Sequence, residues 1–162
     1  MSKKTRLLFL LAVALPALAA DRLSKHWAAG WLAAQTGGAA QAWPGVFGWL
    51  YAENTGMAFS ALSGATGLLA AFSAVLVVFI VCWLLLAKQM PRTLLTGLSL
   101  IAAGGLGNLW DRLFYGYVID FIHLEFMRFA IFNAADVFVC CGAGLVILWL
   151  LLSGRAEQEA AK

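Results

Sequence analysis

The sequence has few charged residues for its length. Of its 162 residues only 12% are Asp, Glu, Lys or Arg, about half of the share that is usual in soluble domains. Hydrophobic residues make up 63%, and the mean hydropathy is +0.87. So few charges cannot cover the surface of a water-soluble globule of this size. The composition excludes a soluble enzyme, a disordered protein and a coiled coil, and it leaves an integral membrane protein.

Cysteines and clusters of basic residues are also scarce. The three cysteines, Cys82, Cys140 and Cys141, lie inside apolar runs, and their odd number gives neither a disulfide framework nor a metal-ligand spacing. The net charge is +3, but the basic residues are scattered and form no patch for nucleic acid. We therefore expect no metal, no cofactor and no nucleic-acid partner.

Long apolar runs predict four transmembrane helices. A spanning helix requires about 20 mostly apolar residues, and residues 65–87, 93–110 and 137–154 contain no charge. A shorter run, 7–20, follows basic residues and could also be a secretory signal peptide cleaved near residue 19. Its apolar pattern continues to about residue 27, which favours an uncleaved first helix.

The distribution of Lys and Arg predicts the orientation of these helices. With the N-terminus in the cytoplasm, the inner side carries seven basic and two acidic residues, and the outer side carries four basic and six acidic residues. Because inner loops of membrane proteins are enriched in Lys and Arg, we expect both termini in the cytoplasm. Most tryptophans then fall near the outer interface, as in an aromatic belt.

Two outer segments, 28–64 and 111–131, connect the predicted spans. In the first, Phe47, Trp49 and Tyr51 alternate with the period of a β-strand, which predicts a short strand on the membrane surface. No repeat or linker divides the chain. The expected fold is therefore one all-α membrane domain over residues 1–162, with four transmembrane helices and a small β element on the outer surface.

The acidic residues point to a functional site. Asp21, Asp111 and Asp136 lie at the outer ends of three different spans, and Asp120 lies on the connection between two of these ends. Ionisable residues at membrane depth are costly and usually face a bundle interior or a watery cavity. Asp120 and Asp136 have no neighbouring cation in the sequence, so they are the strongest candidates.

Structural roles for the same acids stay open. Asp21 precedes Arg22 and Asp111 precedes Arg112, so each could form a plain interfacial ion pair. Asp136 follows a candidate N-cap residue, Asn133, and could be a helix-start residue, because the helix dipole favours a negative charge there.

Two other classes of membrane protein also fit part of the pattern. A proton-conducting subunit would use intramembrane acids, but these should lie near the bilayer midplane, where the long spans have none. A non-catalytic interaction protein could pack through the small surfaces of Gly104 and Gly107, but it would not need paired acids.

Five short motifs occur in a fixed order along the chain. They are DRLSK (21–25), NTGMAF (54–59), GGLGNLWDR (104–112), VIDF (118–121) and FNAAD (132–136). With these motifs and four spans, the sequence resembles the lipoprotein signal peptidases, or signal peptidase II, the aspartyl peptidases of the bacterial inner membrane. The resemblance implies a small sheet cradle on the outer surface, where the aromatic alternation lies.

The resemblance also implies an activity and a set of site residues. The substrates would be prolipoproteins diacylated on the Cys after the signal peptide, cut just before that Cys by the pair Asp120 and Asp136. The protein would be a monomer in contact with membrane lipid, its site near the periplasmic face. Further positions match motif residues that bind the substrate or support the site: Asp21, Lys25, Asn54, Gly56, Asn108, Asp111, Arg112, Asn133 and Ala135.

A pair of carboxyl groups suits this chemistry. One ionised Asp can take a proton from water while a protonated Asp polarises the carbonyl, and two close carboxyls in a low-dielectric site share one proton. The helix dipole favours Asp136 as the base and Asp120 as the acid, although coupled carboxyls titrate as a pair. The aromatic segment with Trp49 is expected to hold the substrate on the outer side.

Overall fold

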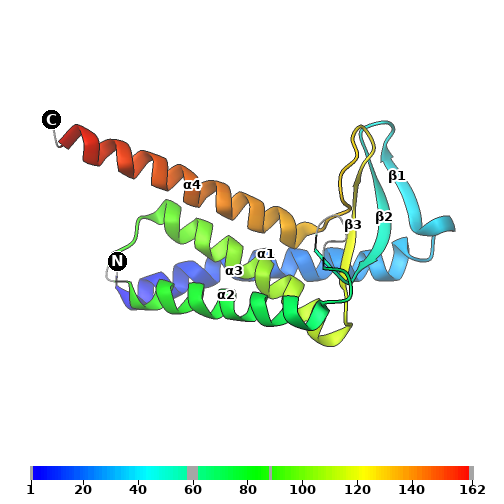
Figure 1. Ribbon diagram of the computed structural model, residues 1–162, viewed down its shortest axis with the longest axis horizontal. Helices are drawn as coiled ribbons and strands as arrows, with labels where there is room; N and C mark the ends of the chain where they lie inside the picture. The colour runs from blue at the N-terminus through cyan, green and yellow to red at the C-terminus, as the bar shows by residue number, and fades with distance from the viewer. Residues whose placement is uncertain (1, 58–61, 88, 161–162) are drawn as a thin grey trace.

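Four long helices form the body of the protein in a computed structural model that describes residues 2–57, 62–87 and 89–160. They are α1 (Lys3–Trp27), α2 (Thr66–Leu86), α3 (Arg92–Phe114) and α4 (Ala134–Ala160) (Figure 1). Each is long and apolar enough to cross a membrane. The four predicted spans are therefore confirmed. Positions 58 and 59 of the NTGMAF motif lie outside the described residues.

Helix α3 lies at the centre of the bundle and packs against the other three helices. Of its most apolar stretch 56% is buried, against 22% or less in each other helix. In lipid, helices associate closely where small residues let two backbones approach. Gly97 of α3 and Gly142 of α4 meet in this way, because a Cβ at Gly142 would lie 2.5 Å from the Gly97 carbonyl oxygen. The predicted small face also exists: Gly107 contacts Asp21 of α1 and Ala135 of α4.

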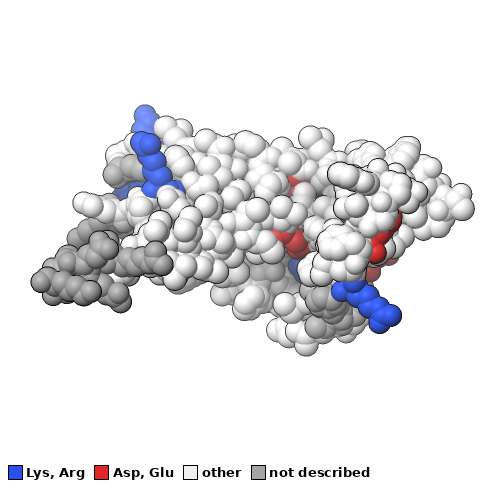
Figure 2. Space-filling model, turned by 90° about the horizontal axis from the view of Figure 1, so that it is seen from above, with Lys and Arg blue, Asp and Glu red and all other residues white. Residues whose placement is uncertain are grey.

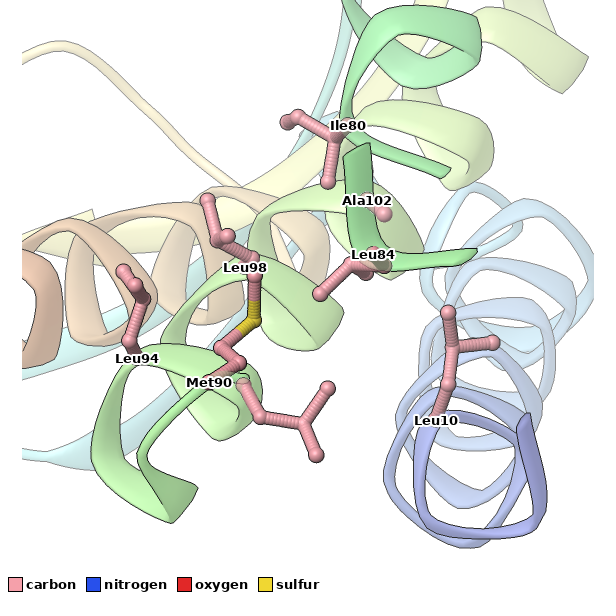
Figure 3. Close-up of a cluster of buried hydrophobic side chains, with 8 residues drawn as sticks. Leu10, Ile80, Leu84, Met90, Leu94, Leu98 and Ala102 are labelled. Atoms are coloured by element: carbon pink, nitrogen blue, oxygen red, sulfur yellow. The ribbon is translucent and has the colours of Figure 1, made fainter. Parts of the chain in front are cut away.

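Apolar side chains hold together the end of the bundle where α1 begins, which we call the far end. Leu10 of α1, Leu84 of α2 and Leu98 of α3 pack there with their neighbours (Figure 3). Leu84 is only 1% exposed and Leu95 is fully buried. Close packing of these apolar side chains therefore fixes this part of the fold, because in lipid van der Waals contacts between helices take the place of a hydrophobic driving force.

The opposite end of the bundle carries a three-stranded antiparallel sheet, and we call it the sheet end. Its strands are β1 (Ala39–Trp43), β2 (Phe47–Asn54) and β3 (Val118–Leu124), with β2 in the middle. The predicted strand at the aromatic alternation is confirmed as β2. The sequence analysis missed β1 and β3. Strand β3 matters for the site because it pairs Asp120 with Ala52 of β2.

Aromatic and apolar side chains dock the sheet on the end of α1. The helix continues beyond Trp27 as a π-helical turn, Ala28–Leu32, whose Ala28 and Leu32 are fully buried against β3. The Trp27 ring lies 5.4 Å from the Trp49 ring and 6.1 Å from the Phe121 ring. Trp49 thus anchors the sheet to α1. The expected role of Trp49 in holding substrate has no support in this packing.

The two ends of the bundle differ in charge. Helix α1 begins and α4 ends at the far end, and the sheet lies at the other (Figure 1). In the face drawn in Figure 2, Lys and Arg lie at one end, and a band without charged side chains separates them from acidic side chains that begin near the middle; a further basic side chain projects at the other end. A band of this kind matches the apolar interior of a membrane.

Candidate active site

Asp120 and Asp136 come together at the sheet end of the bundle. Asp120 lies on β3 with 2% of its surface exposed, and Asp136 lies half-buried in the first turn of α4. Asn133 joins them. Its Nδ2 donates to Asp120 Oδ1 at 2.6 Å, and its main-chain N–H donates to Asp136 Oδ2 at 3.1 Å. A strand and a helix start thus hold two carboxyl groups around one asparagine.

The start of α4 is capped as the sequence analysis expected. Asp136 N–H donates to Asn133 Oδ1 at 3.1 Å, while Asp136 Oδ2 accepts the N–H of Asn133. This reciprocal arrangement satisfies two helix-end donors at once. It uses only one oxygen of Asp136, because Oδ1 accepts a separate bond from Asn108 Nδ2 at 2.8 Å. Asp136 is therefore a helix-start residue and a member of the carboxyl pair at the same time.

Asn54 of β2 contacts Asp120 from the sheet. Its Nδ2 donates to Asp120 Oδ2 at 2.9 Å, and its Oδ1 accepts the N–H of Gly56 at 2.9 Å. Arg112 Nη2 donates to the Gly56 carbonyl at 3.1 Å, which ties this turn to α3. A groove of about 240 Å³ opens beside Asp120, lined by Ala52, Thr55, Ser63, Ala130 and other residues. Asp120 itself is part of the lining of this groove.

Four charged residues form an ionic cluster between α1 and α3. Asp21 and Asp111 are both fully buried. Arg22 bridges them, at 2.6 Å from Asp21 Oδ2 and 2.7 Å from Asp111 Oδ1. Lys25 bridges the other two oxygens, at 3.2 Å from Asp21 Oδ1 and 2.8 Å from Asp111 Oδ2. Such burial is tolerated because every charge has a partner of opposite sign.

The ionic cluster is linked to the carboxyl pair and to α4. Lys25 Nζ donates to Asn108 Oδ1 at 2.7 Å, and Asn108 in turn contacts Asp136. The N–H of Ala135, which is fully buried, donates to Asp21 Oδ1 at 3.2 Å. Asn108 therefore forms hydrogen bonds across the bundle, to Lys25 of α1 and Asp136 of α4.

The structure decides between the two ion pairs that the sequence left open. The pair of Asp21 with Arg22 exists, but Arg22 also holds Asp111, 89 positions away. The alternative pair of Asp111 with Arg112 is not formed: among the described residues Arg112 has no salt bridge with Asp111 and donates to the Gly56 carbonyl instead. Sequence reasoning therefore missed Arg22 as a member of the network. The sequence feature that could have identified Arg22 is its place within the DRLSK motif, between Asp21 and Lys25, which were both assigned to the site.

Two other polar residues of this end have separate roles. Glu125 accepts the N–H of Gly45 at 2.8 Å and ties the turn between β1 and β2 to the end of β3. His123 lies beside the open pocket that the loop 123–130 encloses. Within the described residues His123, Asp120 and Glu125 form no metal-binding group.

The environment of Asp120 lets its carboxyl group hold a proton to a higher pH than an ordinary carboxyl group does. Burial and, to a smaller degree, the negative charge of Asp136 together raise the pKa of Asp120 from 3.8 to about 6, against the opposing effects of hydrogen bonds from Asn54 and Asn133 and of the positive charge of Lys25. A carboxyl that holds its proton can polarise a carbonyl oxygen while an ionised neighbour activates water. The arrangement is therefore suited to acid–base hydrolysis of a peptide bond.

Comparisons with known proteins agree with this chemistry. The family model described as "Signal peptidase (SPase) II" (Peptidase_A8) matches residues 13–152. A lipoprotein signal peptidase of Ectopseudomonas mendocina is 40% identical over 126 residues, which cover 74% of this chain and 75% of the relative. One of Lactococcus lactis subsp. cremoris is 32% identical over 149 residues, which cover 92% of this chain and 96% of the relative.

The fold also matches a solved protein. A structure described as a bacterial membrane enzyme superposes with a TM-score of 0.82 at 26% identity, covering 90% of this chain and 88% of that one. The match includes most of the chain, so the helices and the sheet share one arrangement in the two proteins.

Proposed function

The chain belongs to the signal peptidase II family and removes signal peptides from prolipoproteins as an aspartic peptidase, and we propose that Asp120 and Asp136 are its catalytic pair. The observation that carries the proposal is the contact of one asparagine, Asn133, with both carboxyl groups. Burial supports Asp120 as the protonated partner. The position of Asp136 at the start of α4 supports it as the ionised partner, because the helix dipole favours negative charge there.

The reaction then follows from these two states. Asp136 removes a proton from a water molecule, whose oxygen attacks the carbonyl carbon of the peptide bond. Asp120 donates its proton to the carbonyl oxygen. As the tetrahedral intermediate collapses, the proton held by Asp136 passes to the leaving nitrogen, and Asp120 regains its own. One water is consumed, and both carboxyl groups return to their starting states.

The remaining site residues hold this pair in place. Asn54, Asn108 and Asn133 donate to its oxygens, and Gly56 and Arg112 fix the turn that carries Asn54. Asp21, Lys25 and Asp111 form the ionic cluster beneath, and Ala135 joins that cluster to α4. All of these groups come from a single chain, which supports a monomer as the active unit.

Substrate selection follows from depth in the membrane. The carboxyl pair lies at one end of the spans, so acyl chains on a substrate Cys could stay in the bilayer while the peptide bond reaches Asp120. Burial of hydrocarbon contributes about 0.8 kcal/mol for each CH₂. We therefore propose that the substrate is the diacylated precursor, cut just before its lipid-modified Cys.

A cleavage assay tests the proposed substrate. Purified protein in detergent should convert a diacylated precursor to a faster-migrating product without added metal or nucleotide. The same precursor without lipid should remain uncut under identical conditions. Equal cleavage of both precursors would show that anchoring of the acyl chains in the bilayer does not select the peptide bond that is cut.

The proposed location is the bacterial inner membrane, with both termini in the cytoplasm and the site near the periplasmic face. The excess of Lys and Arg at the far end supports this orientation. In a background without Cys82, Cys140 and Cys141, Thr36→Cys should react with an impermeant thiol reagent from outside, and Gln89→Cys should not. Labelling of both from outside would contradict the orientation.

A further inference from the structure

Each of the three asparagines around the carboxyl pair is oriented by a group that can only donate a hydrogen bond. Gly56 N–H faces Asn54 at 2.9 Å, Asp136 N–H faces Asn133 at 3.1 Å, and Lys25 Nζ lies 2.7 Å from Asn108. A donor-only group must face the amide oxygen. Each NH₂ group is thereby turned toward a carboxyl oxygen of the pair.

The three orienting groups differ in kind. For Asn54 and Asn133 the donor belongs to the main chain, and no substitution of a side chain removes it. For Asn108 the donor is the ammonium group of Lys25. Asn133 Nδ2 also reaches Asn108 Oδ1, but at 3.2 Å, and its shorter bond of 2.6 Å goes to Asp120. Lys25 therefore provides the stronger constraint on the Asn108 amide.

Lys25 is itself held so that one N–H is free for this task. Its side chain is 2% exposed, and Nζ contacts Asp21 Oδ1 and Asp111 Oδ2. Arg22 occupies the other oxygen of each carboxylate. An ammonium group has three donors, and the third is directed to Asn108 Oδ1.

We propose that Lys25 is a positioning residue for catalysis, which orients the Asn108 amide so that its NH₂ group donates to the base, Asp136. The inference rests on the proposed function of the carboxyl pair. Without Lys25 the amide can turn its oxygen toward Asp136, which replaces a hydrogen bond by a repulsion. Within the ionic cluster, Lys25 therefore serves the alignment of the base as well as the fold, whereas Arg22 serves the fold alone.

A double-mutant cycle separates this role from a purely structural one. We compare wild type, Lys25→Met, Asn108→Ala and the double variant for kcat, KM and melting temperature. Lys25→Met should lower kcat about ten- to a hundredfold, as loss of an outer partner of a reactive group commonly does, with KM changed less than about threefold. In the Asn108→Ala background, Lys25→Met should add less than about a threefold loss, since coupled residues are not additive.

Arg22→Met is the matched control. It removes the other cation from the same two carboxylates; within the part of the chain that the structure describes, Arg22 also donates to the Gly107 carbonyl and has no hydrogen bond to Asn108. It should lower the melting temperature about as much as Lys25→Met does but keep kcat within about threefold of wild type. If Lys25→Met cannot be recovered folded, the charge-balanced double variant Lys25→Met/Asp111→Asn replaces it, compared with Asp111→Asn alone.

Two results would overturn the proposal. One is an equal loss of kcat on removing Lys25 with and without Asn108. The other is an equal loss of kcat in Arg22→Met. Either result is informative only when wild type cleaves and Asp136→Asn does not. A cleaving Asp136→Asn variant would instead refute the proposed function, so the two failures are distinguishable.

Discussion

The sheet end of the bundle is stabilised by buried polar and charged side chains, whereas the far end is stabilised by apolar side chains. At the sheet end, Asp21, Lys25, Asp111, Asp120 and Asn133 are buried, and each has hydrogen-bond or ionic partners. At the far end, leucines and Met90 fill the core. Arg6 is the exception there: it is 3% exposed, it donates to the Leu85 carbonyl at 3.5 Å, and its Nε and Nη1 have no partner among the described residues.

The two ends of the bundle therefore meet different requirements: the far end holds the helices together, and the sheet end positions the catalytic groups. Apolar packing is nondirectional, so the far end can hold the helices together with many combinations of side chains. A buried polar network is directional, and a half-satisfied network is worse than none. We therefore expect changes to the groups that hold the carboxyl pair to affect catalysis, and changes at the far end to affect stability alone.

The largest effect should come from the carboxyl pair. Asp120→Asn and Asp136→Asn keep the shape of the side chain but can neither accept nor supply the proton. The rate of cleavage should therefore fall by about 10²- to 10⁴-fold. The measurement is the rate of precursor cleavage by purified, folded variants. Glu125→Gln, a carboxyl change at the same end without contact to the pair, should stay active. Either Asp variant with a tenth of wild-type activity would refute the pair.

A large loss of stability without loss of chemistry should come from the far end. Leu84 is 1% exposed, and Leu84→Ala should cost about 2–5 kcal/mol of unfolding free energy through the cavity that it leaves. Its kcat below the melting temperature should match wild type. Leu86→Ala is the control on the same helix, because Leu86 is 72% exposed. A lowered kcat in Leu84→Ala would show that the two ends are coupled.

A smaller loss should come from the close approach of α3 to α1. A Cβ at Gly107 would lie 2.5 Å from Asp21 Oδ2, so Gly107→Ala should displace the ionic cluster and cost about 1–3 kcal/mol. Gly144→Ala on α4 has no atom within 4 Å of the new Cβ and should not destabilise. Thermal unfolding in detergent compares the two. Equal melting temperatures would mean that the cluster accommodates the methyl group.

The smallest effect should be a pH dependence of stability from Asp120. Its pKa in the folded protein is about 6, above the value of 3.8 for an unperturbed carboxyl. The folded state therefore binds this proton more tightly, and the resulting stabilisation is present below pH 3.8 and lost as the pH rises through 6. Relative to Asp120→Asn, wild type should therefore lose melting temperature as the pH rises from 4 to 7. A constant difference would place the pKa of Asp120 near its ordinary value.

Much of this architecture was predictable because it depends on local patterns. Uncharged runs such as 65–87 predict spans from length alone, and the alternation at Phe47, Trp49 and Tyr51 predicted β2. The run Val118–Leu124 also carried a strand signal in its β-branched and aromatic residues. It was missed because Asp120 interrupts the apolar residues at the centre of this run, which favoured a connecting loop.

The sequence by itself determined that the protein lies in a membrane, how many times its helices can cross it, and which acids lack a cation nearby. These properties follow from the composition and residue spacing of each segment and do not depend on how the segments pack together. Only the tertiary structure decided that Arg22 pairs with Asp111, that Arg112 binds the Gly56 carbonyl, and that Lys25 faces Asn108. Those contacts depend on how α1 and α3 are rotated about their axes. That rotation is set by the packing of all four helices, because a polar group in a low-dielectric interior must find its partner wherever the packing places it.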